Sequence, residues 1–115
     1  MNNKDPKYLK IPNINFSIYT DNNREEEFSK QRLERGFDES EGWSLDCTIA
    51  NFILPRLKAF KHMYNDEENN ICDDIINALE LIIRNEGNRV WTKKENIIVK
   101  KGLRTLADSF LYLWW

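Results

Sequence analysis

Residues 44–64, SLDCTIANFILPRLKAFKHMY, are the stretch that decides the fold. Apolar side chains recur in it every three or four residues, which is the spacing of an α-helix with one buried face. This apolar set consists of Leu45, Ile49, Phe52, Ile53, Leu57, Phe60, Met63 and Tyr64. Ser44 is a suitable N-cap for such a helix. Because proline lacks a backbone N–H, Pro55 predicts a kink within this first long helix.

Two more helices are predicted after a polar loop at residues 65–70. The second spans residues 71–86, and its expected buried face consists of Cys72, Ile75, Ile76, Leu79, Ile82 and Ile83. The last begins after Thr92, because Thr92 and Glu95 have the spacing of a capping box. Its expected apolar face consists of Val99, Leu103, Leu106, Ala107, Phe110, Leu111 and Trp114. Gly102 costs about 1 kcal/mol relative to alanine inside a helix, so it predicts a close approach of another helix.

The N-terminal part predicts a short helix over residues 23–35, because glutamates fill its first turn and Gly36 follows its end. Residues 13–20, NINFSIYT, alternate between polar and apolar side chains, which is typical of a β-strand. That strand has no clear partner in the sequence. It would therefore pair with a second copy of the chain or dock on the helices as an extended arm.

Together these elements predict a mainly α fold with a three-helix core, arranged up-down-up, an N-terminal helix and an extended or β-strand arm. The expected domains are an N-terminal arm over residues 1–22 and a single helical domain over residues 23–115. Three helices of this length bury a modest core, so we expect a homo-oligomer.

The composition is that of one ordinary globular domain, with 115 residues, 41% hydrophobic and 31% charged. A net charge of −2 argues against a protein that coats nucleic acid, which would be strongly basic. No apolar run approaches the roughly 18 residues that span a bilayer, and the N-terminus lacks a secretory pattern. We therefore expect no membrane partner. Its two cysteines, Cys47 and Cys72, are expected to be buried and reduced.

The small net charge conceals alternating blocks of charge along the chain. Residues 21–46 carry nine acidic and four basic side chains, and residues 66–86 carry seven acidic side chains and one basic side chain. Residues 47–65 contain three bases and no acid, and residues 87–115 contain six bases and two acids. Such blocks favour pairing of surfaces within or between chains. The alternative is that they are solvated helix faces, since exposed ion pairs contribute little individually.

The sequence contains no pattern of catalytic or metal-binding residues. It lacks a glycine-rich phosphate loop and the nucleophile motif GxSxG. His62 and Asp66 are four residues apart, but two ligands do not make a metal site. We therefore expect no enzyme activity, no metal and no cofactor.

Basic and aromatic residues around the last helix form the candidate ligand-binding set. This set consists of Arg84, Arg89, Trp91, Lys93, Lys100 and Arg104. An aromatic face beside Arg and Lys side chains holds a base and a phosphate together. Ile97 interrupts the basic stripe one turn after Lys93. The alternative is that Trp91 is a hydrophobic plug and that the bases solvate an outer helix face.

Two motifs carry a resemblance to a known family: WSLDCTIA at residues 43–50 and ILPRLK at residues 53–58. With the terminal LWW, they make the chain similar to small proteins encoded in tailed phages and prophages, whose pattern is WSLDxTIA, ILPxLK and LW. The chain departs from that pattern in a short link between the first two long helices and in Trp115, where the family often has an acid. The resemblance transfers no catalytic residue.

What the resemblance implies is a phage origin and work inside the host bacterial cytoplasm. Within the motifs, Asp46 and Thr48 would orient a partner group or, alternatively, fasten the start of the helix. The motif positions, expected to be mainly structural, are Trp43, Asp46, Thr48 and Pro55.

The sequence therefore predicts a phage accessory protein that antagonises host antiviral defence. We expect a non-enzymatic oligomeric binder that sequesters a nucleotide-derived signal, such as a cyclic nucleotide or an ADP-ribose-type molecule. The alternative is an inhibitor or adaptor that binds a host protein through the aromatic C-terminal surface at residues 112–115. Nucleic-acid binding through the last helix is disfavoured by the acidic blocks.

Overall fold

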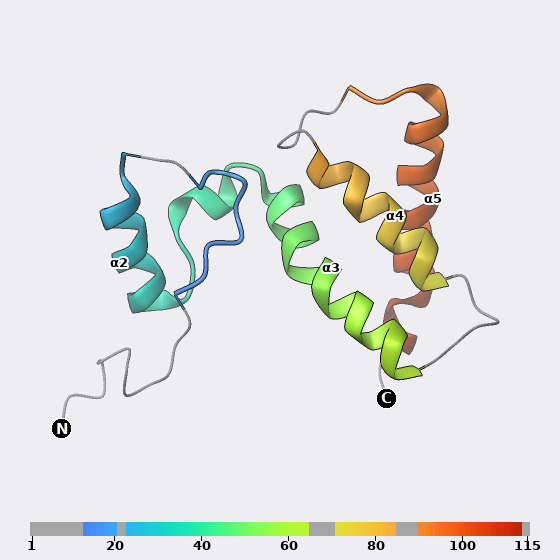
Figure 1. Ribbon diagram of the computed structural model, residues 1–115, viewed down its shortest axis with the longest axis horizontal. Coiled ribbons are helices and arrows are strands. Elements are labelled where there is room, and N and C mark those ends of the chain that lie inside the picture. The colour runs from blue at the N-terminus through green and yellow to red at the C-terminus, as the bar shows by residue number, and fades with distance from the viewer. Residues whose placement is uncertain (1–12, 21–22, 65–70, 85–89, 114–115) are drawn as a thin grey trace. The chain divides into compact units, whose positions relative to one another are not determined.

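The computed structural model describes residues 13–20, 23–64, 71–84 and 90–113 (Figure 1). The chain divides into two compact units, residues 1–48 and residues 49–115. All regular elements in the described residues are helical, which confirms the mainly α prediction. The predicted boundary between an arm at 1–22 and a domain at 23–115 stays a prediction.

The first unit contains the helix α2 (Glu25–Arg35) and the short 3-10 helix η1 (Glu39–Gly42). α2 begins with three glutamates, which favour the positive N-terminal end of a helix. It ends at Gly36, whose φ of +92° lies in the left-handed region that glycine adopts without strain. The helix predicted over residues 23–35 is thus confirmed, with its start two residues later.

The β-strand predicted over residues 13–20 is not formed in the described structure. The backbone N–H groups of this segment donate to side chains rather than to a neighbouring strand. Phe16 N donates to Glu41 Oε1 at 3.2 Å, and Ser17 N donates to Asn15 Oδ1 at 2.8 Å. Ser17 is the buried residue of the segment, whereas Ile14 is half-exposed. The polar contacts therefore override the apolar alternation that predicted a strand.

A buried polar network holds the first unit together. The Arg32 guanidinium donates to the Asp38 carboxylate and to Glu25, and its Nε donates to Asn13 Oδ1 at 2.7 Å. Burial raises the pKa of Asp38, but hydrogen bonds from Ser40 and Arg32 outweigh that effect and leave the pKa below its ordinary value. Asp38 therefore stays charged at neutral pH inside the unit.

The long helix α3 (Leu45–Tyr64) begins where the Ser44 carbonyl accepts hydrogen bonds from the backbone N–H groups of Cys47 and Thr48. It runs through Pro55 as one continuous element, and the expected kink stays a prediction. Its buried apolar residues are Cys47, Ala50, Leu54 and Leu57, so the predicted apolar set is confirmed at Leu57 and does not include the other three. Apolar residues stand at adjacent positions in this helix, such as Ile53 and Leu54, so spacing alone does not single out the buried face. The predicted core residues that are instead exposed are Leu45, Ile49, Phe52 and Met63.

In the second unit, α4 (Ile71–Ile83) and α5 (Lys93–Ser109) lie side by side (Figure 1). The expected inner face of α4 is confirmed at Cys72, Ile75, Ile76, Leu79 and Ile82. A Cβ atom at Gly102 would lie 2.2 Å from Ala78 Cβ and 2.4 Å from the Asp74 carbonyl oxygen. The close helix approach predicted at Gly102 is therefore present, and α4 is the helix that approaches.

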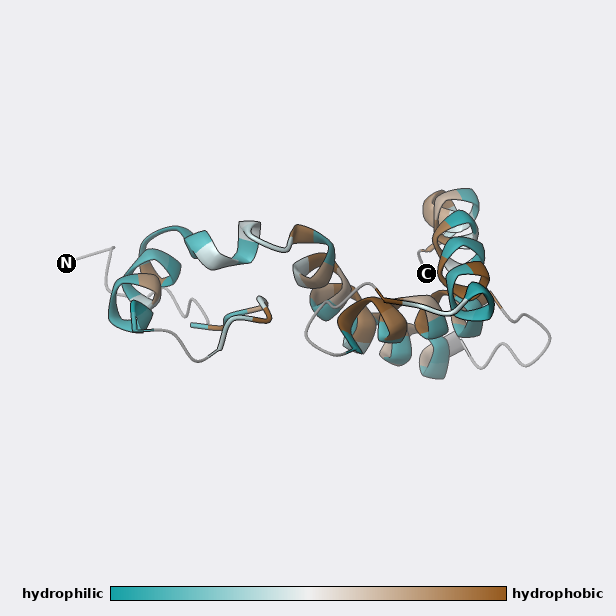
Figure 2. Cartoon of the chain, turned by 90° about the horizontal axis from the view of Figure 1, so that it is seen from above, coloured by the Kyte–Doolittle hydropathy of each residue, from teal (hydrophilic) through white to brown (hydrophobic). Residues whose placement is uncertain are grey.

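The apolar face predicted for the last helix is only partly buried. Val99 and Gly102 face the core, but Leu103, Phe110 and Leu111 are exposed. The short 3-10 helix η3 (Phe110–Tyr112) continues directly from α5. Figure 2 shows that the helices of the second unit carry hydrophobic residues along one side and hydrophilic residues along the other.

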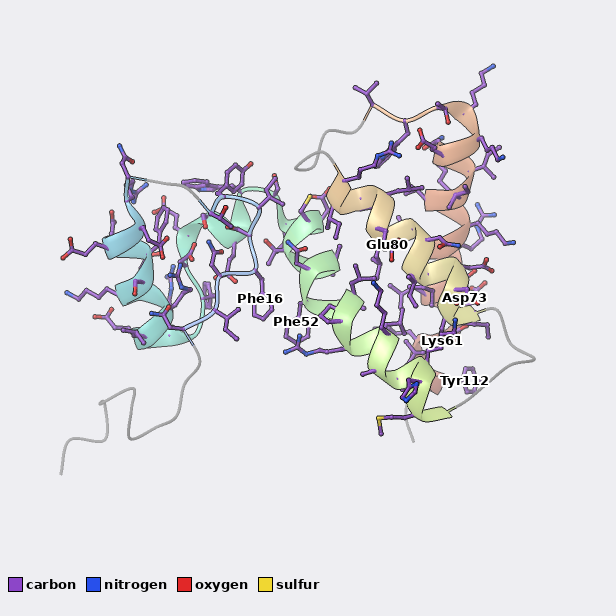
Figure 3. The ribbon with its side chains drawn as sticks, viewed as in Figure 1. Phe16, Phe52, Lys61, Asp73, Glu80 and Tyr112 are labelled. Atoms are coloured by element: carbon purple, nitrogen blue, oxygen red, sulfur yellow. The ribbon has the colours of Figure 1, made fainter. Side chains whose placement is uncertain are left out.

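Acidic side chains of α4 pair with bases on both neighbouring helices. Glu80 lies 3.2 Å from Lys58, and Asp73 pairs with Lys61; Figure 3 labels Lys61, Asp73 and Glu80. On its other side, Asp74 Oδ2 lies 3.7 Å from Lys101 Nζ. These pairs neutralise part of the acidic block at residues 66–86 and leave other bases of α5 unmatched.

Candidate functional site

The outward face of α5 forms a shallow, open depression with a volume of about 440 Å³. Lys100 and Arg104, two of the predicted ligand-binding residues, line it. The other lining residues are Ile97, Lys101, Thr105 and Asp108. These six positions follow each other at intervals of one or three residues, which places them on one side of a helix. We call this depression the α5 groove.

The α5 groove is electropositive. Neither Lys100 nor Arg104 makes a hydrogen bond or an ion pair with another residue in the described part of the chain. Lys101 shares its charge with Asp74 across a loose 3.7 Å contact, and its side chain remains two-thirds exposed. Asp108, the one acidic side chain among the described lining residues, lies at the C-terminal end of the groove. Among those residues three cations thus outnumber one carboxylate, and two of the cations are available for an anion.

Two other predicted ligand-binding residues lie at the junction of α4 and α5, where each has a structural partner. The Arg84 guanidinium forms an ion pair with Glu95. Trp91 is half-buried, and its indole N–H donates to the Leu81 carbonyl at 3.2 Å. These contacts support the alternative in which Trp91 is a plug between helices. Arg84 and Trp91 therefore do not join Lys100 and Arg104 in one site.

The capping box predicted at the start of α5 is confirmed. Thr92 Oγ1 accepts from the Glu95 backbone N–H at 3.1 Å, and Glu95 Oε1 accepts from the Thr92 backbone N–H at 3.0 Å. The hydrogen bond from Arg84, together with that from the Thr92 N–H, lowers the pKa of Glu95 to about 2. This carboxylate therefore remains charged at neutral pH and fixes the first turn of the helix.

Lys93 and Arg89 complete the predicted ligand-binding set. Lys93 is exposed at the first position of α5. It lies on the same side of the helix as Lys100 and Arg104, but it does not line the α5 groove. Arg89 lies outside the described residues. The candidate set does not contain Thr105 and Asp108, nor Lys101, which belongs to the same predicted basic stripe as Lys100 and Arg104. The spacing of all three residues indicates the same face. The prediction also treated Ile97 as an interruption, whereas Ile97 lines the groove.

The motif residues around the start of α3 have structural roles in the first unit. Trp43 packs edge-on against Tyr19 and Phe28, with ring centroids 5.2 and 5.6 Å apart respectively. Thr48 Oγ1 donates to the Glu41 carbonyl at 2.7 Å, which ties the first turn of α3 to η1. Asp46 lies in that same first turn. At Thr48, the contact supports the alternative that this residue fastens the start of the helix.

Near Pro55, the Arg56 guanidinium donates to the Phe52 carbonyl at 2.9 Å and lies 3.9 Å from the centroid of the Phe52 ring. A cation over an aromatic face is attracted by the ring. The carbonyl that loses its backbone donor to Pro55 is that of Asn51, so this contact does not replace the missing hydrogen bond.

A second exposed feature lies at the C-terminal end of α5. Leu111 is 82% exposed and Tyr112 is 76% exposed, and Phe110 beside them is also exposed. Consecutive large apolar residues at this exposure are unusual on a monomer surface unless a partner covers them. Trp114 and Trp115, also predicted to belong to this surface, lie outside the described residues.

Some functions lack a structural basis in the described residues. Among them, no cluster of three or more His, Cys, Asp or Glu side chains could hold a metal ion. Both cysteines are buried there and form no disulfide, as expected. In the same residues, no helix is long and apolar enough to cross a membrane.

Comparisons of the chain with protein-family models, with curated proteins and with solved structures found no match.

Proposed function

We propose that the protein is a non-enzymatic binder of a phosphate-bearing small molecule, and that the α5 groove is its binding surface. One observation carries the proposal: Lys100 and Arg104 lie one turn apart in the groove, without a partner among the described residues. Cationic side chains that lack an intramolecular partner are the groups that charge-assisted hydrogen bonds to phosphate require.

The groove alone is open, and small-molecule sites usually enclose most of the ligand surface. A homo-oligomer, as expected from the sequence, would supply a second wall. The basic charge of α5 and the resemblance to phage proteins support a nucleotide-derived host signal as the ligand, bound in the host cytoplasm and withdrawn from its receptor. In that role the protein antagonises antiviral defence without a chemical step.

Isothermal titration with cyclic dinucleotides and with cyclic ADP-ribose isomers tests this proposal. A saturable heat signal is expected for the wild-type chain, and the double variant Lys100→Ala/Arg104→Ala is expected to lose it. Lys94→Ala is the matched control, because Lys94 is an exposed base of the same helix that does not line the groove. Absence of heat with every ligand at protein concentrations of about 50 μM, where a micromolar Kd is measurable, contradicts the proposal.

A second candidate function is supported by the exposed C-terminal turn. Phe110, Leu111 and Tyr112 form an apolar surface of the kind that anchors protein interfaces. In this alternative the protein is an inhibitor or adaptor of a host protein. A pull-down from host lysate tests this alternative. A stoichiometric host protein that binds the wild type and Lys100→Ala/Arg104→Ala but not Leu111→Asp supports it. A host protein that binds Leu111→Asp but not Lys100→Ala/Arg104→Ala contradicts it.

A further inference from the structure

We infer that the α5 groove recognises a linear chain of phosphates rather than the base or sugar of a nucleotide. This inference rests on the proposed function and specifies its ligand class. The ligand would be an unbranched di- or triphosphate, free or attached to a nucleoside. The inference starts from what the groove contains and from how its charges are spaced.

The cations of the groove are concentrated within one helical turn. Lys100 and Arg104, with Lys101 between them, are four residue steps apart, which corresponds to a rise of roughly 6 Å along the helix axis. A short phosphate chain presents several negative charges over such a span. A cyclic dinucleotide instead carries one charge on each of two phosphodiesters, which the sugars hold apart. The charge density of the groove therefore matches the linear chain better.

The groove lacks groups that would read a base. Among the described residues, the groove lining contains no aromatic ring on which a base could stack. The Thr105 hydroxyl donates to the Lys101 carbonyl at 2.8 Å, so its proton is already used in a hydrogen bond within the helix. Trp91, the aromatic residue predicted to stack on a base, is tied to α4 by the hydrogen bond to Leu81. Phosphate oxygens are thus the groups that the lining residues favour most.

Asp108, the one carboxylate among the described lining residues, makes the two ends of the groove electrostatically different. Asp108 repels anions at the C-terminal end, whereas the free backbone N–H groups of a helix favour them at the N-terminal end. Lys93, on the same side of α5, adds positive charge toward that end. A phosphate chain would therefore lie from Arg104 toward Lys93 and away from Asp108. Removal of the Asp108 charge is expected to strengthen binding rather than weaken it.

Titration calorimetry with sodium tripolyphosphate, pyrophosphate, adenosine triphosphate, adenosine and cyclic diadenylate tests the inference, in magnesium-free buffer at low ionic strength. Tripolyphosphate and adenosine triphosphate are expected to bind equally well and at least tenfold more tightly than cyclic diadenylate, with adenosine giving no heat. Lys100→Ala/Arg104→Ala is expected to weaken tripolyphosphate binding at least tenfold. Asp108→Asn is expected to strengthen it severalfold, and Lys94→Ala to leave it within twofold.

The possible failures are distinguishable. If cyclic diadenylate binds more tightly than tripolyphosphate, and Lys100→Ala/Arg104→Ala abolishes that binding, the inference is wrong and the proposed function stands. If no ligand binds, both are wrong. If Lys94→Ala weakens tripolyphosphate as much as the groove variant does, binding reflects overall charge and the inference is wrong. Circular dichroism of each variant confirms the fold, and all four substituted side chains are exposed.

Discussion

At position 102 the absence of a side chain decides how closely α4 and α5 pack. The backbone oxygen of Asp74 and the Cβ atom of Ala78 occupy the space that a side chain at Gly102 would need. Neither atom belongs to a flexible side chain that could move aside. The glycine is therefore required by its neighbours, although it is intrinsically unfavourable inside a helix.

Gly102→Ala is expected to destabilise the protein by about 2 kcal/mol. Overpacking at two immovable contacts costs about 3 kcal/mol, and the better helix propensity of alanine offsets about 1 kcal/mol of that. Urea denaturation measures the free energy of unfolding. Gly42→Ala is the control, because no atom lies within 4 Å of its added Cβ. A variant at position 102 that is as stable as this control would show that the two helices are not in close contact.

Asp38→Asn is expected to destabilise the first unit by about 3 kcal/mol, because it leaves the buried Arg32 guanidinium with one less carboxylate. The exposed pair between Arg24 and Glu27 provides the comparison, and Glu27→Gln is expected to cost less than about 1 kcal/mol. Equal losses from the two substitutions, measured by thermal unfolding, would contradict a buried role for Asp38.

Sequence reasoning succeeded at residues whose role is local. The spacing of Thr92 and Glu95 defines a capping box within one turn, and Gly36 follows the last turn of α2. It failed where the partner lies outside the same helix. In the sequence, Arg32 and Asp38 have the pattern of solvent-exposed charges. Only the fold of the first unit brings them together in a buried network. Arg84 was likewise assigned to a ligand because its pairing with Glu95 depends on how the two helices meet.

At the scale of elements, α5 carries both the packing face and the candidate binding face of the second unit. Gly102 and Val99 face the core, and Lys100 and Arg104 lie in the groove on another side. The orientation of the groove therefore depends on the helix being fixed at its first turn and packed against α4. The spacing of the basic residues predicts the basic stripe on this helix. It does not predict that the C-terminal apolar residues are exposed, because exposed and buried apolar residues both recur at helical spacing along the chain.

Thr92→Ala is expected to cost about 1 kcal/mol of stability, because the Glu95 backbone N–H loses its capping partner. Hydrogen exchange is the measurement, and the first turn of α5 should lose protection relative to the wild type. Thr105→Ala, which removes a hydroxyl later in the same helix, is expected to leave the first turn unchanged. Loss of protection in both variants would contradict a specific capping role.

Acid is expected to weaken the start of α5. The pKa of Glu95 is lowered to about 2 in the folded protein, below its ordinary value of 4.5. Its contribution to stability is therefore complete above about pH 4.5 and is lost as the pH falls toward 2. Glu95→Gln keeps the capping geometry and removes the titration. The melting temperature of this variant should depend less on pH in that window, and an unchanged pH dependence would contradict the assignment.

At the scale of the whole molecule, the chain consists of two compact units with different kinds of core. The first is held by the buried charges around Arg32, and the second by the apolar packing of α4 against α5. Composition predicts one ordinary domain and gives no sign of this division, because the acidic residues that build the first core resemble surface charge.

Thermal unfolding is expected to depart from two-state behaviour because the two units have separate cores. Scanning calorimetry should give a measured enthalpy larger than the van't Hoff value. Asp38→Asn should shift one component of the transition to lower temperature, and Gly102→Ala should shift the other. A single transition that both variants shift equally would contradict two units.

Binding of phosphate in the α5 groove is tested most directly by an NMR titration of the wild-type chain with tripolyphosphate. Shifts of backbone amide signals are expected to be largest at residues 97–105 and to saturate. They should be absent from α2 and from the Lys100→Ala/Arg104→Ala variant. Saturable shifts centred on another element, or no shifts at millimolar ligand, would contradict the assignment of α5 as the binding face.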